Sequence, residues 1–202
     1  MFLSLLYIKI IKTMKLRKLT LIFSMLAIVS AIFISCNHTS GGKNDLNGVK
    51  YYRGILFSET PWDIERGVRE ITPSQSEKIN SYKFTYSDDG KLLSVEYVRG
   101  DVLLGYGSLG GAAKISYEYR DNTQLKRYFN DKNEQIEVNG VYVSEYMLNT
   151  DGIRLGLMNI GKTGEMIENR NKIHSWTWSV LEDGMLRENR YNLKGDETVM
   201  NE

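Results

Sequence analysis

The chain has 202 residues, of which 26 are Lys or Arg and 25 are Asp or Glu, and its formal charge is +1 at pH 7. Residues 1–35 contain five basic and no acidic residues, so residues 36–202 hold 21 basic against 25 acidic ones, a formal charge of −4. This acidic remainder has no cluster of Lys and Arg, which excludes the basic surface that nucleic-acid binding requires. We therefore expect no nucleic-acid partner, and the length suits one domain with its own core.

The N-terminal segment carries the parts of a secretion signal in the right order. A basic stretch, residues 15–18, precedes an uncharged apolar run, residues 19–35, and the only cysteine of the chain, Cys36, follows at once. The pattern resembles the lipobox family of bacterial lipoproteins. The resemblance implies that residues 1–35 are a helical signal peptide, cleaved after Ser35. It also implies that the Cys36 thiol carries a lipid with acyl chains such as palmitate.

Two alternatives concern this leader. At about 1.5 Å per residue, the 17 residues from 19 to 35 lie at the lower limit for crossing a hydrocarbon core of roughly 30 Å, so an uncleaved helical anchor stays open. Residues 1–13 add a second apolar patch ahead of the basic stretch, and we hypothesise that translation starts at Met14. Asn37 differs from the aspartate that holds enteric lipoproteins at the inner membrane. The resemblance therefore favours the outer membrane of a bacterial cell envelope.

Residues 36–50 are rich in Asn, Gly, Ser and Thr. Such a composition buries too little apolar surface to fold, and it predicts a flexible tether between the lipid and the domain. Because Cys36 is the only thiol, the folded part has no disulfide and must be stabilised by packing and strand pairing.

Residues 51–80 are expected to form an N-terminal strand and one short helix. Residues 51–58 alternate loosely between apolar and polar side chains, as a strand does. Thr60 and Pro61 match the N-cap and the first position of a helix, which predicts a helix near 61–71. A Thr-Pro pair follows, and we expect it to end this helix.

Residues 81–202 show one pattern four times, namely an aromatic strand, a turn and a second alternating strand. Each unit is expected to be a β-hairpin, because its strands alternate and its turn contains Asp-Gly or Asp-Asn. The units are Phe84-Thr85-Tyr86 with Asp89-Gly90, Tyr117-Glu118-Tyr119 with Asp121-Asn122, Tyr146 with Asp151-Gly152, and Trp176-Thr177-Trp178 with Asp183-Gly184. The expected fold is therefore mainly β, an antiparallel meander of repeated hairpins.

These units resemble the tyrosine-aspartate (YD) repeats of bacterial surface and toxin proteins and the related MORN-like hairpin repeats. Residues 86–92, Tyr-Ser-Asp-Asp-Gly-Lys-Leu, follow the YD spacing from aromatic to glycine to leucine. The aspartate that normally follows the tyrosine is replaced in all four units. The resemblance implies a repetitive sheet that serves as a surface or scaffold and has no catalytic residues to transfer. No capping element follows the fourth hairpin, so a truncated reading frame stays open.

The motifs in the sequence that could bind a cofactor or a metal are incomplete, so we expect neither. Residues 105–110 match the glycine pattern of dinucleotide sites, but a strand rather than a helix follows them. Residues 131–137 loosely resemble a calcium loop, yet Ile136 occupies the position that requires glycine. His174 is the only histidine after the tether, so it has no second histidine for a zinc site or a catalytic pair.

Two functional hypotheses follow. The preferred one is a non-catalytic, lipid-anchored β-repeat protein that acts as a surface or periplasmic scaffold or binding module, with the membrane and a protein or glycan ligand as partners. Its candidate binding residues form an aromatic stripe, Tyr97, Tyr117, Tyr119, Trp176 and Trp178. The alternative is an envelope polysaccharide hydrolase that uses paired carboxylates, which requires a cleft with the two groups about 5 to 10 Å apart.

Overall fold

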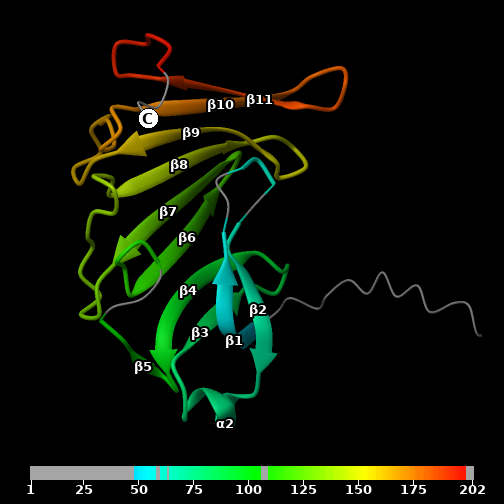
Figure 1. The fold of residues 1–202 in the computed structure, drawn as a ribbon, viewed down its shortest axis with the longest axis vertical. Coiled ribbons are helices and arrows are strands. Elements are labelled where there is room, and N and C mark those ends of the chain that lie inside the picture. Colours follow the sequence, from blue (N-terminus) through cyan, green and yellow to red (C-terminus); the bar gives the residue numbers. More distant parts are fainter. Residues whose placement is uncertain (1–47, 58–59, 63, 106–108, 199–202) are drawn as a thin grey trace, which may run out of the picture. The chain divides into compact units, whose positions relative to one another are not determined.

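Eleven antiparallel strands form one continuous sheet in the computed structural model of the chain (Figure 1). The structure describes residues 48–57, 60–62, 64–105 and 109–198. The expected signal peptide, its cleavage site at Ser35, the lipidation site at Cys36 and residues 37–47 of the expected tether lie outside the described residues. The last three residues of the expected tether, 48–50, belong to the first strand instead. Every described element belongs to one unit, Leu46–Glu202.

Most strands lie next to their predecessor in the sequence. The strands are β1 (Gly48–Leu56), β2 (Arg66–Ile71), β3 (Ser81–Tyr86), β4 (Leu92–Arg99), β5 (Val102–Leu103), β6 (Lys114–Arg120), β7 (Thr123–Phe129), β8 (Val143–Leu148), β9 (Arg154–Ile160), β10 (Ser175–Val180) and β11 (Leu186–Tyr191). Their spatial order is β11-β10-β9-β8-β7-β6-β4-β3-β1-β2, and β5 pairs with β4 beside this path. The predicted fold, a mainly β antiparallel meander of hairpins, is confirmed.

The N-terminal strands depart from the meander order. β1 lies between β2 and β3 and pairs with both in the antiparallel sense. The chain therefore passes from β2, at the edge of the sheet, to β3 on the other side of β1. The single-turn helix α2 (Pro73–Ser76) lies in this crossing, at the bottom of Figure 1.

The helix predicted near 61–71 is wrong, because Arg66–Ile71 forms β2 and pairs with β1. The ring of Tyr52 lies so close to Gly67 that a Cβ there would stand 2.2 Å from it, so glycine allows an aromatic side chain to pack against this strand. The helix α2 begins at the Thr-Pro pair, where the predicted helix was expected to end, and Thr72 is its N-cap in a capping box. A Thr-Pro pair supplies a cap and the favoured first helical position, so it starts a helix here.

Side-chain alternation gives the sheet two different faces. On the face that we call the inner face, Val95 on β4 lies beside Ile115 on β6, and both side chains are buried. Their neighbours in the sequence, Glu96 and Lys114, point to the opposite, outer face and form an ion pair at 3.1 Å. One buried and one charged face are typical of an antiparallel sheet that is covered on one side only.

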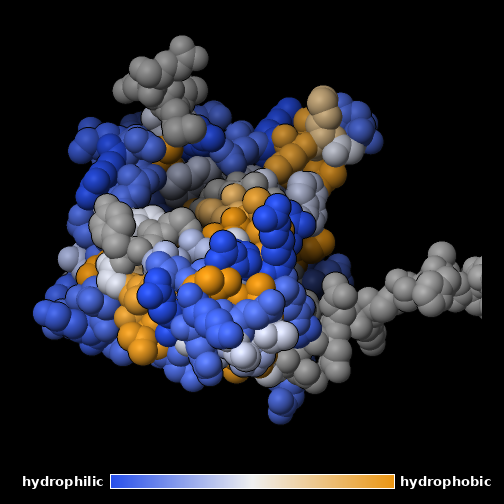
Figure 2. Space-filling view, turned by 60° about the horizontal axis from the view of Figure 1, so that its bottom comes forward, coloured by the Kyte–Doolittle hydropathy of each residue, from blue (hydrophilic) through white to orange (hydrophobic). Residues whose placement is uncertain are grey.

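The inner face is covered by the connections of the sheet itself. Within the described residues the only helix is the single turn α2, so no helical layer packs there. The connection before β6 contributes Leu109 and Ala112 to the main buried cluster. In the connection between β1 and β2, the carbonyl of Pro61 accepts a hydrogen bond at 3.2 Å from the N–H of Arg154 on β9. That cluster comprises Tyr52, Tyr82, Phe84, Leu92, Val95, Leu109, Ala112, Ile115, Tyr117 and Tyr128, and a smaller one comprises Tyr146, Leu157 and Trp178. Hydrophobic side chains at the surface lie in separate patches among hydrophilic ones (Figure 2).

The turns between strands repeat one geometry. Four of them begin at an asparagine, namely Asn130, Asn149, Asn169 and Asn192. In each, the asparagine N–H donates to the carbonyl four residues later at 2.9 to 3.0 Å, and its side-chain oxygen accepts two more backbone N–H groups at 2.8 to 3.1 Å. The fourth residue has a φ between 59° and 84°, a region that favours glycine and asparagine. The turns within hairpins and those between hairpins are thus built alike.

We expect Gly152→Ala to lower the free energy of unfolding by about 1–2 kcal/mol, because the left-handed backbone strains any Cβ. Gly152 has a φ of +77°, and no atom lies within 4 Å of a Cβ built there, so steric crowding adds nothing. Gly152→Asn is the matched control, since Asn133 occupies the same turn position with a φ of 59°. Urea unfolding measures both variants, and equal losses for Ala and Asn would contradict this turn geometry.

Candidate functional site

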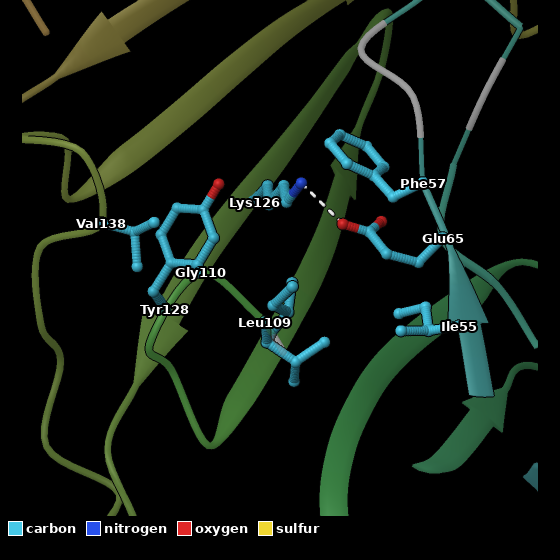
Figure 3. A pocket seen from close by; sticks show the side chains of 9 residues that line it. Ile55, Phe57, Glu65, Leu109, Gly110, Lys126, Tyr128 and Val138 are labelled. Carbon is cyan, nitrogen blue, oxygen red and sulfur yellow. Dashed lines mark ion pairs between the residues drawn. The ribbon is translucent and has the colours of Figure 1, made fainter. Parts of the chain in front are cut away.

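A buried ion pair lies on the inner face (Figure 3). Glu65, just before β2, pairs with Lys126 on β7, with 2.7 Å between Lys126 Nζ and Glu65 Oε1. The Lys126 and Glu65 side chains are only 3% and 2% exposed. Tyr117 on β6 donates its hydroxyl hydrogen to the other carboxylate oxygen, Oε2. Groups from three separate parts of the sequence therefore share one buried polar network.

Strand alternation directs Lys126 inward. It lies two residues before Tyr128, whose buried side chain belongs to the main cluster, and its register partners on β6 and β8 are Tyr117 and Ser144. The ring centroid of Phe57, which follows β1, stands 4.0 Å from Nζ, and that of Tyr128 stands 5.6 Å from it. The ammonium is thus enclosed by a carboxylate and by aromatic faces, which attract a desolvated cation.

A pocket of about 370 Å³ opens beside this pair. Its lining consists of Ile55, Phe57, Glu65, Leu109, Gly110, Ile115, Lys126, Tyr128 and Val138. Phe57 and Glu65 approach from the β1–β2 connection, whereas Lys126 and Tyr128 stand on β7 (Figure 3). The walls are mostly apolar and the ion pair supplies a polar end, a combination typical of small-molecule sites.

A second pocket of about 360 Å³ shares Phe57, Tyr128 and Val138 with the first. The rest of its lining is Asn139, Val141, Ser144, Leu157, Asn159, Asn169, Asn171, Ile173, Trp176, Glu188 and Arg190. We call the first the ion-pair pocket, the second the asparagine pocket, and the two together the trough. The trough follows the inner face from β1 to β11.

Another buried cation lies beside the trough, where β7, β8 and β9 meet. The guanidinium of Arg154 lies 3.6 Å from the centroid of the Tyr146 ring, and it donates to Gln124 Oε1 from Nε at 3.1 Å and from Nη2 at 2.8 Å. Gln124 Nε2 donates in turn to the hydroxyl oxygen of Tyr119 at 2.9 Å. Burial raises the pKa of Tyr119 above its ordinary value.

The far end of the trough holds a second acid. Glu188 on β11 accepts a hydrogen bond from Trp178 Nε1 at 2.7 Å through Oε2. Its other oxygen, Oε1, pairs with Arg190 Nη2 at 2.6 Å. Both carboxylate oxygens are engaged, and the charge is balanced within the same strand.

Four carboxyl groups outside the trough have a lowered pKa. The pKa values of Asp89, Asp101, Glu118 and Glu165 are lowered chiefly by side-chain hydrogen bonds from Lys91, Lys83, Arg120 and Thr163 respectively. These groups lie on turns and on the outer face. The described part of the chain also holds no group of three or more His, Cys, Asp or Glu side chains that could bind a metal ion.

The structure places the predicted aromatic stripe on the inner face. Tyr117 and Trp178 are buried, each with 5% of its surface exposed, and both use their polar tips within the protein. Tyr97 and Tyr119 are partly buried and pack against the main cluster. Trp176 is the member that lines the trough. The binding role of the stripe stays a prediction. Trp176 is the residue of the stripe that a ligand in the trough would contact.

Sequence reasoning missed the polar residues of the trough, which include Glu65, Lys126, Ser144, Asn159 and Asn169. Lys126 could have been found from strand alternation, because it occupies an inward position of β7, two residues before the buried Tyr128. Nothing near Glu65 in the sequence identifies it as the partner of Lys126. That pairing depends on how the β1–β2 connection crosses the sheet.

The weaker motifs take other structural roles. His174 is buried, and its Nδ1 lies 2.9 Å from the carbonyl oxygen of Ile167. Asp131, in the segment that resembles a calcium loop, lies within the turn that begins at Asn130. Residues 106–108 of the glycine-rich segment lie outside the described residues. In the described ranges, no helix is long and apolar enough to cross a bilayer.

Comparisons with known proteins gave no match. No protein-family model, no curated protein and no solved structure matches the chain. The resemblances to the lipobox and to the hairpin repeats therefore stay predictions from the sequence, and the candidate site rests on its own geometry.

Lys126→Met is expected to lower the free energy of unfolding by about 3–5 kcal/mol, because Glu65 would stay buried without its cation. Glu65→Gln added to the same chain should recover most of the loss, since the uncharged amide can still accept the hydrogen bond from Tyr117. Urea unfolding gives both values. A double variant no more stable than Lys126→Met would contradict the role of the ion pair.

Proposed function

We propose that the protein is a non-catalytic binding module attached by a lipid on Cys36 to the bacterial cell envelope, with the outer membrane favoured over the inner. The lipobox-like sequence that ends at Cys36 supports the anchor. The polar composition of residues 36–47 supports a tether that holds the sheet close to the membrane. The net negative charge after residue 35 is consistent with a partner other than nucleic acid.

The observation that carries the binding function is the charge balance of the trough. Its two carboxylates, Glu65 and Glu188, are matched by Lys126 and Arg190. The rest of its polar lining consists of uncharged amide and hydroxyl groups, with aromatic rings between them. A concave site of this kind holds a ligand by shape, apolar contact and hydrogen bonds. It supplies a general acid or base only if one of the ion pairs opens.

Hydrolysis of envelope polysaccharide is the competing function, and the same trough would have to perform it. Glu65 and Glu188 would be its two carboxylates. Each would have to leave its cation when substrate binds, and Glu65 would leave a lysine that is itself almost fully buried. Breaking a buried pair of this kind is strongly unfavourable.

We expect the full-length protein, incubated with bacterial envelope polysaccharide, to retain ligand without releasing reducing ends. Glycan and peptide arrays probed with the same protein measure binding independently of turnover. Glu188→Gln is the matched variant for catalysis, since it removes the acid and keeps an acceptor for Trp178 Nε1. Release of reducing ends that Glu188→Gln abolishes would establish the hydrolase. Absence of binding to every array would contradict the binding module.

Cys36→Ser is expected to abolish incorporation of radiolabelled palmitate, because a serine hydroxyl does not replace the lipidated thiol. Intact-mass measurement should show that the unsubstituted chain has lost residues 1–35 and gained the lipid, while Cys36→Ser keeps its leader. N-terminal sequencing of that uncleaved variant then shows whether translation starts at Met14. Ser35→Ala, which keeps a small residue before the cysteine, is the control. If the unsubstituted chain is itself unlabelled and uncleaved and stays in the membrane, the helical anchor is indicated instead.

A further inference from the structure

We propose that the asparagine pocket binds an uncharged saccharide unit through the hydroxyl groups of its ring, a proposal that rests on the binding function above. Three polar side chains of this pocket are more than nine-tenths buried, namely Ser144, Asn159 and Asn169, with exposures of 6%, 2% and 7%. Burying such groups is unfavourable unless a partner satisfies them. Their hydrogen bonds therefore show what a ligand has to supply.

Each of the three side chains has one polar atom without a partner among the described residues. Asn159 Nδ2 donates to the carbonyl oxygen of Ile173 at 2.9 Å, which leaves Oδ1 as an acceptor. Asn169 Oδ1 accepts the N–H groups of Asn171 and Ile173 at 2.9 and 3.1 Å, which leaves the Nδ2 hydrogens as donors. The Ser144 hydroxyl makes no hydrogen bond within the described chain. These bonds also determine the orientation of both amide groups, because a flipped amide would lose them.

These three atoms are accessible to solvent. In the described part of the chain, Ser81 Oγ is the side-chain atom that is sealed from solvent without a hydrogen-bond partner. The free atoms of Ser144, Asn159 and Asn169 are therefore not sealed, and all three residues line the asparagine pocket. The pocket thus presents an acceptor, a pair of donors and a hydroxyl that can do both.

Aromatic rings accompany these polar groups. Trp176 on β10 and Tyr128 on β7 belong to the same lining, and Phe57 forms the wall toward the ion-pair pocket. A sugar ring offers apolar C–H faces and hydroxyl groups around its rim. Flat aromatic faces suit the first, and mixed donors and acceptors suit the second. A volume of about 360 Å³ is at the small end of ligand pockets, which suits one or two sugar rings.

The charges favour an uncharged sugar. Glu188 and Arg190 are the charged side chains of this lining, and they pair with each other at 2.6 Å. A charged ligand would have to break that pair or leave its own charge unmatched. An uncharged saccharide needs neither.

The floor of the pocket disfavours an extended peptide. Peptides commonly bind by adding a strand to the edge of a sheet. Ser144 on β8 and Asn159 on β9 lie in the interior of the sheet, where β8 pairs with β7 and β9, and β9 pairs with β8 and β10. Recognition here therefore has to use side chains, which matches a sugar better than a peptide backbone.

The test is titration calorimetry of the full-length protein in a detergent without a sugar headgroup. The probes are three uncharged disaccharides, di-N-acetylchitobiose, cellobiose and mannobiose, with digalacturonic acid as the charged comparison. We expect at least one uncharged probe to bind and the charged one to bind more weakly. Ser144→Ala and Asn169→Asp should each weaken binding about tenfold, the usual effect of losing one hydrogen bond.

Asn149→Asp is the matched control. Asn149 caps the β8–β9 turn as Asn169 caps its own turn, with two backbone N–H groups on Oδ1 at 3.0 and 2.8 Å. Aspartate keeps this acceptor in both turns. Only Asn169 lines the asparagine pocket, and Asn149→Asp should therefore bind the sugar as the unsubstituted chain does.

Three outcomes would overturn the proposal. The first is that none of the uncharged disaccharides binds at 10 mM, roughly the weak limit of specific recognition. The second is that they bind equally well after Ser144→Ala and Asn169→Asp. The third is that Asn149→Asp weakens binding as much as Asn169→Asp does. If peptide arrays capture the protein and Ser144→Ala abolishes that capture, the ligand class is wrong and the binding function stands. If neither sugars nor peptides bind, both fail.

Discussion

The ion pair between Glu65 and Lys126 is the contact on which the inner face depends. A single sheet has no second layer to cover its apolar side, so its own connections must do so. The pair holds the β1–β2 connection over β6 and β7, and the Tyr117 hydroxyl orients the carboxylate. Because a buried charge without its partner is strongly unfavourable, the pair keeps Glu65 beside Lys126. In that position Phe57 becomes the wall that the two pockets share.

The repeated turns carry different side chains in the two halves of the sheet. Five-residue turns begin at Ser87 and Asn149, and the strands shift register at the same place before both. The residue that follows the first turn is Leu92, a member of the main apolar cluster. The residue that follows the second is Arg154, which stacks on Tyr146. One backbone design thus produces an apolar core in one half and a polar site in the other.

This division explains how the candidate binding site and a stable domain can share one sheet. Without a disulfide, stability comes from the apolar cluster and the regular turns. The C-terminal strands contribute less apolar burial, because their buried cluster of Tyr146, Leu157 and Trp178 is smaller than the main one. A site with balanced charges gains specificity from hydrogen-bond geometry rather than from net charge. Attachment through Cys36, as proposed, would keep such a site concentrated at the envelope surface.

The hairpins were predictable from the sequence because strand alternation and turn residues are local signals. Alternation also placed the stripe residues Trp176 and Trp178 on one face of their strand. The helix near 61–71 was mispredicted, since pairing of those residues with β1 outweighs their local pattern. The trough could not be predicted, because Glu65 meets Lys126 only after one connection crosses the inner face. The sequence by itself determined the four hairpins and their turns, and it predicts a lipid anchor. Tertiary structure decided which polar side chains become buried neighbours, since those contacts join residues that no local pattern relates.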